Sequence, residues 1–110
     1  MIDYIKALFG LYTPSEPVQS LLEYVTKHGE FDEYNNFSAE CFGGAKITML
    51  CSTGYSIYSA SQYHLRNRFN FTRAEVYWLE SKLQDYVVKR LVDDAVTRRI
   101  KLNDWLQKQK

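Results

Sequence analysis

The 110-residue chain has no run of the roughly 18 consecutive apolar residues that a membrane-spanning helix needs. Its opening, MIDYIKALFGLY, has an acidic residue at position 3, no basic stretch and no small-residue cleavage site, so it does not resemble a secretory signal. We therefore expect a cytoplasmic protein that does not contact a membrane. Apolar side chains at helical spacing in residues 2–11 predict a short amphipathic helix instead.

Cysteine is scarce, and the two that occur, Cys41 and Cys51, are compatible with a reducing compartment. We expect them to point to opposite faces of a sheet and not to form a disulfide. Nucleophilic catalysis would require one of them beside a base such as His28 or His64. Neither cysteine lies in a recognisable catalytic signature, so an enzyme of unfamiliar type that uses Cys51 or His64 is the third hypothesis for function.

Other chemical motifs are missing as well. The chain has no Cys-x-x-Cys, no His-Glu-x-x-His, no calcium-loop spacing and no glycine-rich loop that opens a helix. The segment HGEFDE at 28–33 has an imidazole and three carboxylates but reads as an acidic, solvated loop. Asp93 and Asp94 are neighbours on a predicted helix and point in different directions, which does not suit a general acid–base pair. The sequence predicts no enzyme activity, no cofactor and no metal site.

The residues that are present suit a single folded domain spanning 1–110. Apolar residues make up 45% of the chain and aromatic residues 15%, enough for a substantial core. The segment TPSE at 13–16 predicts the start of a second helix, with either Thr13 or Ser15 as its N-cap. His28 and Gly29 mark the end of that helix.

The middle of the chain predicts an antiparallel meander of three strands. The runs FSAECF (37–42), AKITMLCS (45–52) and YSIYSASQY (55–63) are β-prone. Gly43-Gly44 has the composition of a two-residue hairpin turn, which would place Phe42 opposite Ala45. Residues 59–70 fit either the end of a strand or a short helix.

The last third contains the strongest local signal. FTRAEV at 71–76 combines Thr72 as N-cap with Glu75 as its capping-box partner, and predicts a helix from Arg73 to about Arg99. The expected fold is α+β, in the order α-α-β-β-β-α, with this long helix packed on the sheet. The expected core residues are Leu8, Phe9, Leu21, Leu22, Val25, Ile47, Leu79, Leu83, Val87 and Leu91.

A second apolar stripe on the long helix is the most informative irregularity. The residues expected to bind a protein are Val88, Val92, Val96, Ile100 and, beyond the stripe, Trp105. The first four, which are spaced by four residues, lie on a different face from the core stripe. Either the two N-terminal helices of the same chain cover this face, or another chain does, as a second copy or as a target. Trp105 likewise either docks onto its own domain or forms a binding hot spot.

Charge is unevenly distributed along the chain. Residues 1–60 contain three lysines and seven acids, a balance of −4, whereas residues 61–110 contain eleven basic residues and six acids, a balance of +5. A nucleic-acid interface would draw on Arg66, Arg68, Arg73, Arg98, Arg99 and Lys101. At a rise of about 1.5 Å per residue, the long helix would hold these two groups about 40 Å apart. This spacing does not suit one compact footprint.

Taken together, these features predict a small, cytoplasmic, non-enzymatic interaction protein that acts by binding another protein. Such a protein would be a regulator or inhibitor, of the kind that phages and other mobile elements encode, and a homodimer is one form of it. A nucleic-acid-binding protein is the first alternative.

Overall fold

The computed structural model describes residues 12–109. The helical and strand elements in this range are α2 (Glu16–His28), β1 (Glu30–Phe31), β2 (Phe37–Glu40), β3 (Lys46–Leu50), β4 (Ser56–Ile57), α3 (Ser59–Tyr63) and α4 (Arg73–Lys108). The helix predicted over residues 2–11, together with its expected core residues Leu8 and Phe9, lies outside the described residues.

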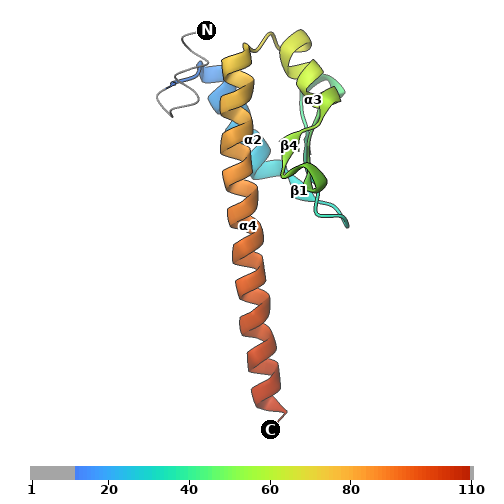
Figure 1. Cartoon of the computed structure of the whole chain (residues 1–110), viewed down its shortest axis with the longest axis vertical. Helices are drawn as coiled ribbons and strands as arrows, with labels where there is room; N and C mark the ends of the chain where they lie inside the picture. Colours follow the sequence, from blue (N-terminus) through green and yellow to red (C-terminus); the bar gives the residue numbers. More distant parts are fainter. Residues whose placement is uncertain (1–11, 110) are drawn as a thin grey trace.

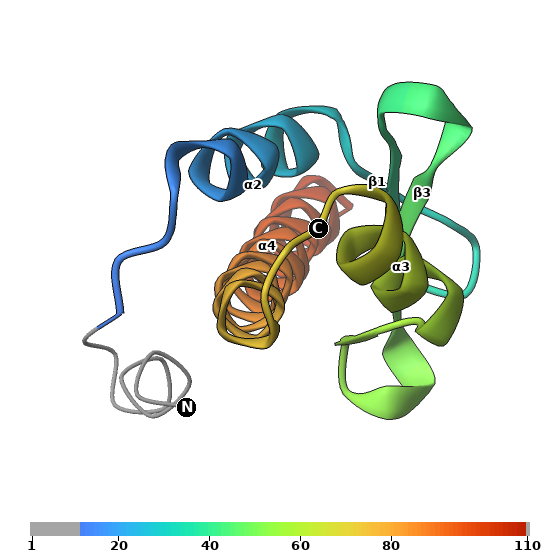
Figure 2. The same cartoon turned by 90° about the horizontal axis from the view of Figure 1, so that it is seen from above.

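The chain has an elongated shape with principal extents of 61 × 32 × 24 Å. Its long axis is set by α4, which runs the full height of Figure 1 while the other elements gather along its first half. Seen end-on, α4 lies between α2 on one side and the sheet with α3 on the other (Figure 2). The α+β class and the long C-terminal helix are confirmed.

Helix α2 begins after Ser15, so Ser15 and not Thr13 is its N-cap, with Pro17 tolerated in the first turn. The helix ends where the Gly29 N–H donates to the Val25 carbonyl. A Cβ atom at Gly29 would lie 2.2 Å from the ring of Phe37, which is closer than any real contact. Glycine is therefore required here because the ring of β2 packs directly on the end of the helix.

The sheet has four antiparallel strands in the order β1-β2-β3-β4, not the predicted three. The additional strand, β1, lies in the segment predicted to be an acidic loop. It pairs with β2 because Asp32 organises a tight turn, accepting hydrogen bonds from the backbone N–H groups of Tyr34 and Asn36. Asn35 completes the turn with a φ of 63°, a conformation that asparagine tolerates.

The β2–β3 hairpin differs from the prediction by one residue. The Cys41 N–H donates to the Ala45 carbonyl, so the loop contains three residues, Phe42–Gly44, and not two. Both glycines have positive φ values, of 74° and 76°. Cys41 is therefore opposite Ala45, and the argument that put the two cysteines on opposite faces is wrong. Both thiols are free, at opposite ends of β3.

The predicted third strand is short, and the chain turns into helix directly after β4. The hydroxyl of Ser61 accepts from the Thr48 N–H and donates to the Lys46 carbonyl. The Ser61 side chain thus provides hydrogen-bond partners for two backbone groups of β3. A longer β4 would otherwise pair with these groups. Residues 59–68 are helical throughout, with the π-helical turn His64–Arg68 following α3, which decides the alternative left open by the sequence.

Helix α4 has the predicted capping box, with the Thr72 hydroxyl accepting from the Glu75 N–H and the Glu75 carboxylate accepting from the Thr72 N–H. The same carboxylate accepts a hydrogen bond from the Ser15 hydroxyl and so joins the starts of α2 and α4. Burial alone would raise the pKa of Glu75, but the hydrogen bonds from Ser15 and Thr72 outweigh it and lower the pKa below its usual value. The helix continues to Lys108, well past the predicted end near Arg99.

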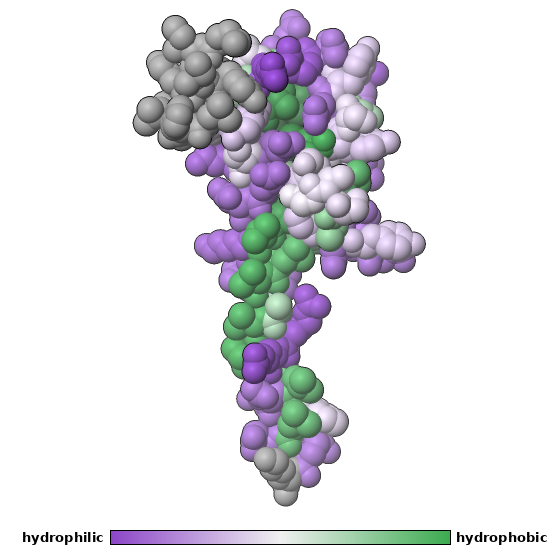
Figure 3. All heavy atoms as spheres, in the orientation of Figure 1, coloured by the Kyte–Doolittle hydropathy of each residue, from purple (hydrophilic) through white to green (hydrophobic). Residues whose placement is uncertain are grey.

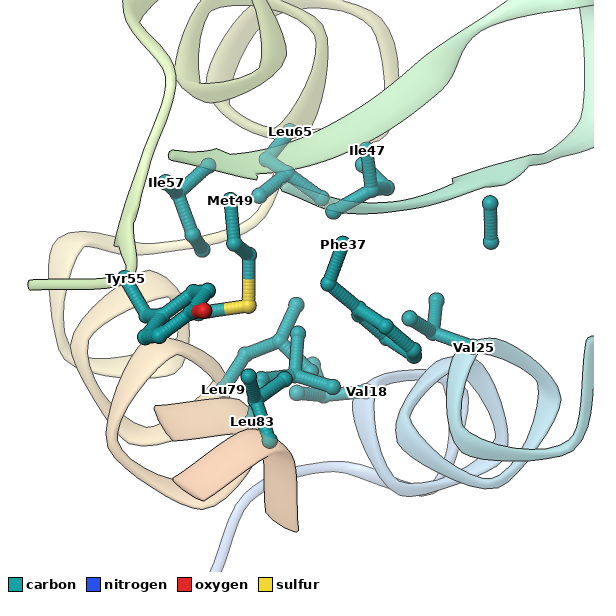
Figure 4. Packing of buried hydrophobic residues seen from close by; sticks show 12 residues of the cluster. Val18, Val25, Phe37, Ile47, Met49, Tyr55, Ile57, Leu65, Leu79 and Leu83 are labelled. Atoms are coloured by element: carbon teal, nitrogen blue, oxygen red, sulfur yellow. The ribbon is translucent and has the colours of Figure 1, made fainter. Parts of the chain in front are cut away.

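The core is a single cluster in which side chains of the sheet point towards α4 and α2 (Figure 4). Of the expected core residues that the structure describes, five are buried and three are partly buried against the cluster. The buried ones are Val25, Ile47, Leu79, Leu83 and Val87, and the partly buried ones are Leu21, Leu22 and Leu91. Buried residues that the expected list omits include Phe37, Met49, Ile57 and Leu65.

Candidate protein-interaction surface

The second half of α4 extends away from the rest of the molecule (Figure 1). The last fully buried residue of the helix is Val87, and every residue from Ala95 to Gln109 is exposed. From Ala95 onwards the helix is therefore surrounded by solvent within the described part of the chain, whereas Leu91 and Asp94 are still partly buried.

Large apolar side chains cover much of this solvated half, as Figure 3 shows for its lower part. We call these side chains together the α4 apolar face, and its members, with their exposed fractions, are Val88 (50%), Val92 (56%), Val96 (54%), Ile100 (55%), Leu102 (54%), Trp105 (56%) and Leu106 (43%). At about 3.6 residues per turn they cover more than half of the helix circumference, with Val96 and Trp105 on opposite sides. All five residues that the sequence singled out for protein binding belong to it. Leu102 and Leu106 extend the surface towards the C-terminus.

Helix α2 does not cover the α4 apolar face. It packs beside the first half of α4, where the Tyr86 hydroxyl donates to the Thr26 carbonyl at 2.9 Å. The neighbours Val87 and Val88 show the division most clearly, because Val87 is wholly buried and Val88 is half exposed. Of the two N-terminal helices offered as one alternative, α2 therefore does not cover the second stripe. Trp105, at the far end, also remains exposed.

The border between the body and the projecting half is held by Arg90. Its guanidinium donates to the Tyr86 hydroxyl at 2.9 Å and lies over the ring of Phe31, 5.9 Å from the ring centroid. About two turns further on, the Arg98 Nε donates to the Asp94 carbonyl at 3.3 Å. Arg98 therefore lies along the same edge of the helix as Asp94, beside the α4 apolar face.

The basic residues named from the sequence form two separate groups. Arg66 and Arg68 lie on the π-helical turn, and Arg66 lines a hollow together with Arg73 and the acidic Glu80. Arg98 follows Arg73 by 25 residues of continuous helix, a separation of about 38 Å. The structure brings Arg66 and Arg73 together but keeps Arg98, Arg99 and Lys101 at the other end of the molecule.

The catalytic candidates are not assembled into a site. Cys51 lies exposed in the turn after β3, where its N–H donates to the Asn36 side chain. His64 begins the π-helical turn, and within residues 12–109 no hydrogen bond joins it to Cys51. Burial raises the pKa of the Cys41 thiol, which makes it a poorer nucleophile at neutral pH. Over the same residues, no group of three or more His, Cys, Asp or Glu side chains is placed to hold a metal ion.

A second apolar surface was not anticipated from the sequence. A groove opens between α2 and the tip of the β2–β3 hairpin, lined mainly by Leu21, Tyr24, Cys41, Phe42, Phe69 and Phe71. Phe42 stands at its rim, 89% exposed on the glycine loop. The residues come from three distant segments, so periodicity within any one of them could not reveal the groove. The only local signal was a large aromatic beside two glycines.

None of the helices in the described range combines the length and hydropathy needed to cross a bilayer. Comparisons of the chain with protein families, with curated proteins and with solved structures found no match.

Proposed function

We propose that this chain is a non-enzymatic interaction protein that binds another protein chain through the α4 apolar face. The observation that carries the proposal is the exposure of seven large apolar side chains on a helix half that no other described element covers. An apolar surface of this extent on a folded protein commonly marks a site of association. Trp105 adds a residue type that is enriched among binding hot spots.

The composition of the projecting half supports the same proposal. Val92, Val96, Thr97 and Ile100 are β-branched residues, which form helices less readily than alanine or leucine. Most helical stability in proteins comes from packing an apolar face, and short helices without such packing are marginal in water. A partner on the α4 apolar face would supply the packing that this half lacks within its own chain.

The mode of action we propose is binding that blocks or scaffolds a partner in the cytoplasm, in the manner of a regulator or inhibitor. The thiols and imidazoles are not brought together in one site, so they give no support to catalysis. Bound protein would instead be held by burial of the aliphatic stripe, with charged residues at its edges selecting among partners.

The double variant Val92→Asp, Val96→Asp tests the proposal. Both side chains are more than half exposed, so the folded monomer should keep its helical circular dichroism and its urea midpoint. Retention of partner by the immobilised protein should be lost, because two carboxylates would have to be buried on binding. The matched control is Thr97→Asp, which adds a charge to the polar side of the same helix. Global unfolding of the double variant would contradict the proposal, because it would assign the stripe to the core.

Nucleic-acid binding is the second candidate, and what favours it is the shared hollow of Arg66 and Arg73. Its affinity would fall steeply with salt, because each phosphate contact releases counterions. Gel-shift assays at low salt test it, with Arg66→Ala compared against Arg99→Ala at the far end of α4. Absence of any shift at low salt would remove this candidate.

A further inference from the structure

We infer that the occupant of the α4 apolar face is a second copy of this chain, bound antiparallel through the C-terminal half of α4. This inference rests on the proposed function, of which it specifies the partner.

A strip with coiled-coil spacing runs along the projecting half of α4 and contains four of the seven residues of the α4 apolar face. Alternating steps of four and three residues select Val88, Val92, Ala95, Arg99, Leu102 and Leu106. This period keeps one line of side chains facing a neighbouring helix along its whole length, as in a left-handed coiled coil. Arg99, near the middle, is the only charged member of the strip.

The charge of Arg99 argues against a parallel pair. A parallel pair in register would place Arg99 opposite Arg99, with Arg98 and Lys101 of both copies at nearly the same level. Six positive charges would then share one short stretch of interface, and like charges in close proximity oppose association. An antiparallel pair centred near Thr97 lessens this repulsion, because it sets the two Arg99 side chains about 6 Å apart along the axis and the two Lys101 side chains about 12 Å apart.

Antiparallel pairing centred level with Thr97 also matches side-chain sizes. It places Val88 opposite Leu106 of the second copy, and Val92 opposite its Leu102. By symmetry each of these layers occurs twice, and each combines a short side chain with a longer one. The same register gives Arg99 the smallest residue of the strip, Ala95, as its opposite neighbour. Alternation of small and large residues across facing positions is what close packing requires.

The side chains on both edges of the helix are compatible with a two-fold axis level with Thr97. On one edge, Val96 approaches Val96 of the second copy, with the exposed Ile100 next to it. On the other edge, Asp94 and Arg98 from each copy meet at the axis. Arg98 already lies along Asp94 in the single chain, so two copies would form a cluster with equal numbers of positive and negative side chains.

The length of the projecting half fits such a pair. The overlap from residue 88 to residue 106 spans about 27 Å and begins directly after Val87, the last residue buried by the body. The body of the second copy, which in each chain extends to Leu91, would therefore lie beside the last turn of the first copy's α4 and beyond it. A standard interface of about 800 Å² per partner would take about a tenth of the 7873 Å² surface of this chain.

Cross-linking of single cysteine variants tests both the partner and its orientation. The background is the full chain with Cys41→Ser and Cys51→Ser, first checked for a native circular dichroism spectrum. In this background Val96→Cys should be joined efficiently by a short bismaleimide reagent, because position 96 lies beside its own copy near the axis. Val88→Cys is the matched control, since antiparallel pairing holds the two copies of position 88 about 27 Å apart.

Light scattering of the unmodified chain gives the second readout. We expect a dimer that persists at high salt and a dissociation constant raised at least ~100-fold by Val92→Asp, because the carboxylate would be buried in the seam. Cross-linking of Val88→Cys in place of Val96→Cys would overturn the antiparallel arrangement. A monomer at concentrations up to about 100 μM, combined with loss of partner retention in the Val92→Asp, Val96→Asp variant, would overturn the second copy as occupant while leaving the proposed function intact.

Discussion

Two adjacent valines on α4 provide the sharpest test of where the core ends. Val87 is fully buried and Val88 is half exposed, although both are in the same helix and have the same propensity. We therefore predict that Val87→Ala and Val88→Ala have very different effects on the free energy of unfolding of the monomer. The comparison controls for helix propensity, because the substitution is identical at the two positions.

The magnitudes follow from burial. At Val87, removal of two buried methyl groups loses about 1.6 kcal/mol of transfer free energy, and the cavity left behind adds about 1 kcal/mol. The better helix propensity of alanine returns about 0.5 kcal/mol, so the net loss is about 2 kcal/mol. At Val88 only half of the side chain is covered, so the transfer loss of about 0.8 kcal/mol is largely offset, and the net change is close to zero.

Urea unfolding followed by circular dichroism measures both values, at a protein concentration low enough for light scattering to give the monomer mass. At higher concentration, where the chain associates, Val88 should be the more sensitive position. Val88→Ala should weaken self-association, whereas Val87→Ala should lower stability without a specific effect on the interface. A loss of about 2 kcal/mol for both variants would refute the reasoning, because it would show that Val88 is packed in the monomer core.

Two further predictions concern the body of the molecule. Gly29→Ala should cost about 2–3 kcal/mol in unfolding free energy because its Cβ would collide with an aromatic ring. Gly43→Ala should cost only about 1 kcal/mol, because position 43 has open space and only its φ of 74° is unfavourable for alanine. Equal urea midpoints for the two variants would contradict this prediction. Because the pKa of Glu75 is lowered in the folded state, the carboxylate stabilises the fold above its unfolded pKa of about 4.3, and this stabilisation is lost as the pH falls through the lower folded value. Glu75→Gln should therefore be less stable than the unmodified chain at pH 7 and lose less stability between pH 5 and pH 3, which urea midpoints at several pH values would show; parallel curves for the two proteins would speak against the role of this carboxylate.

Features that depend on neighbouring residues in the sequence were predicted well. The capping box of Thr72 and Glu75 forms as expected, since its hydrogen bonds join residues three positions apart. The core stripe of α4 was also correctly placed, because helical periodicity alone determines which side chains share a face. The same periodicity identified the second stripe from Val88 to Ile100.

Features that depend on one specific long-range contact were not predicted. The hairpin register depends on whether Cys41 or Phe42 lies opposite Ala45 and closes the loop. A change of one residue at this point alters every pair along the two strands. The helix at 59–63 depends on Ser61 bonding to the backbone of β3, a contact between segments more than ten residues apart. The groove beside Phe42 combines residues from three segments, so no local sequence pattern could predict it.

The sequence by itself determined the class of the fold, the start of its long helix and the existence of two apolar faces on that helix, because these follow from local hydrogen bonding and from the 3.6-residue period. Only the tertiary structure decided which of the two faces is covered. The sheet and α2 cover α4 along its first half, with Val87 as its last fully buried residue and Leu91 as the last residue packed against the core, and the α4 apolar face begins at Val88 on another side of the helix. Coverage of a helix depends on the lengths and positions of its neighbours in space, and no pattern within the helix itself contains that information.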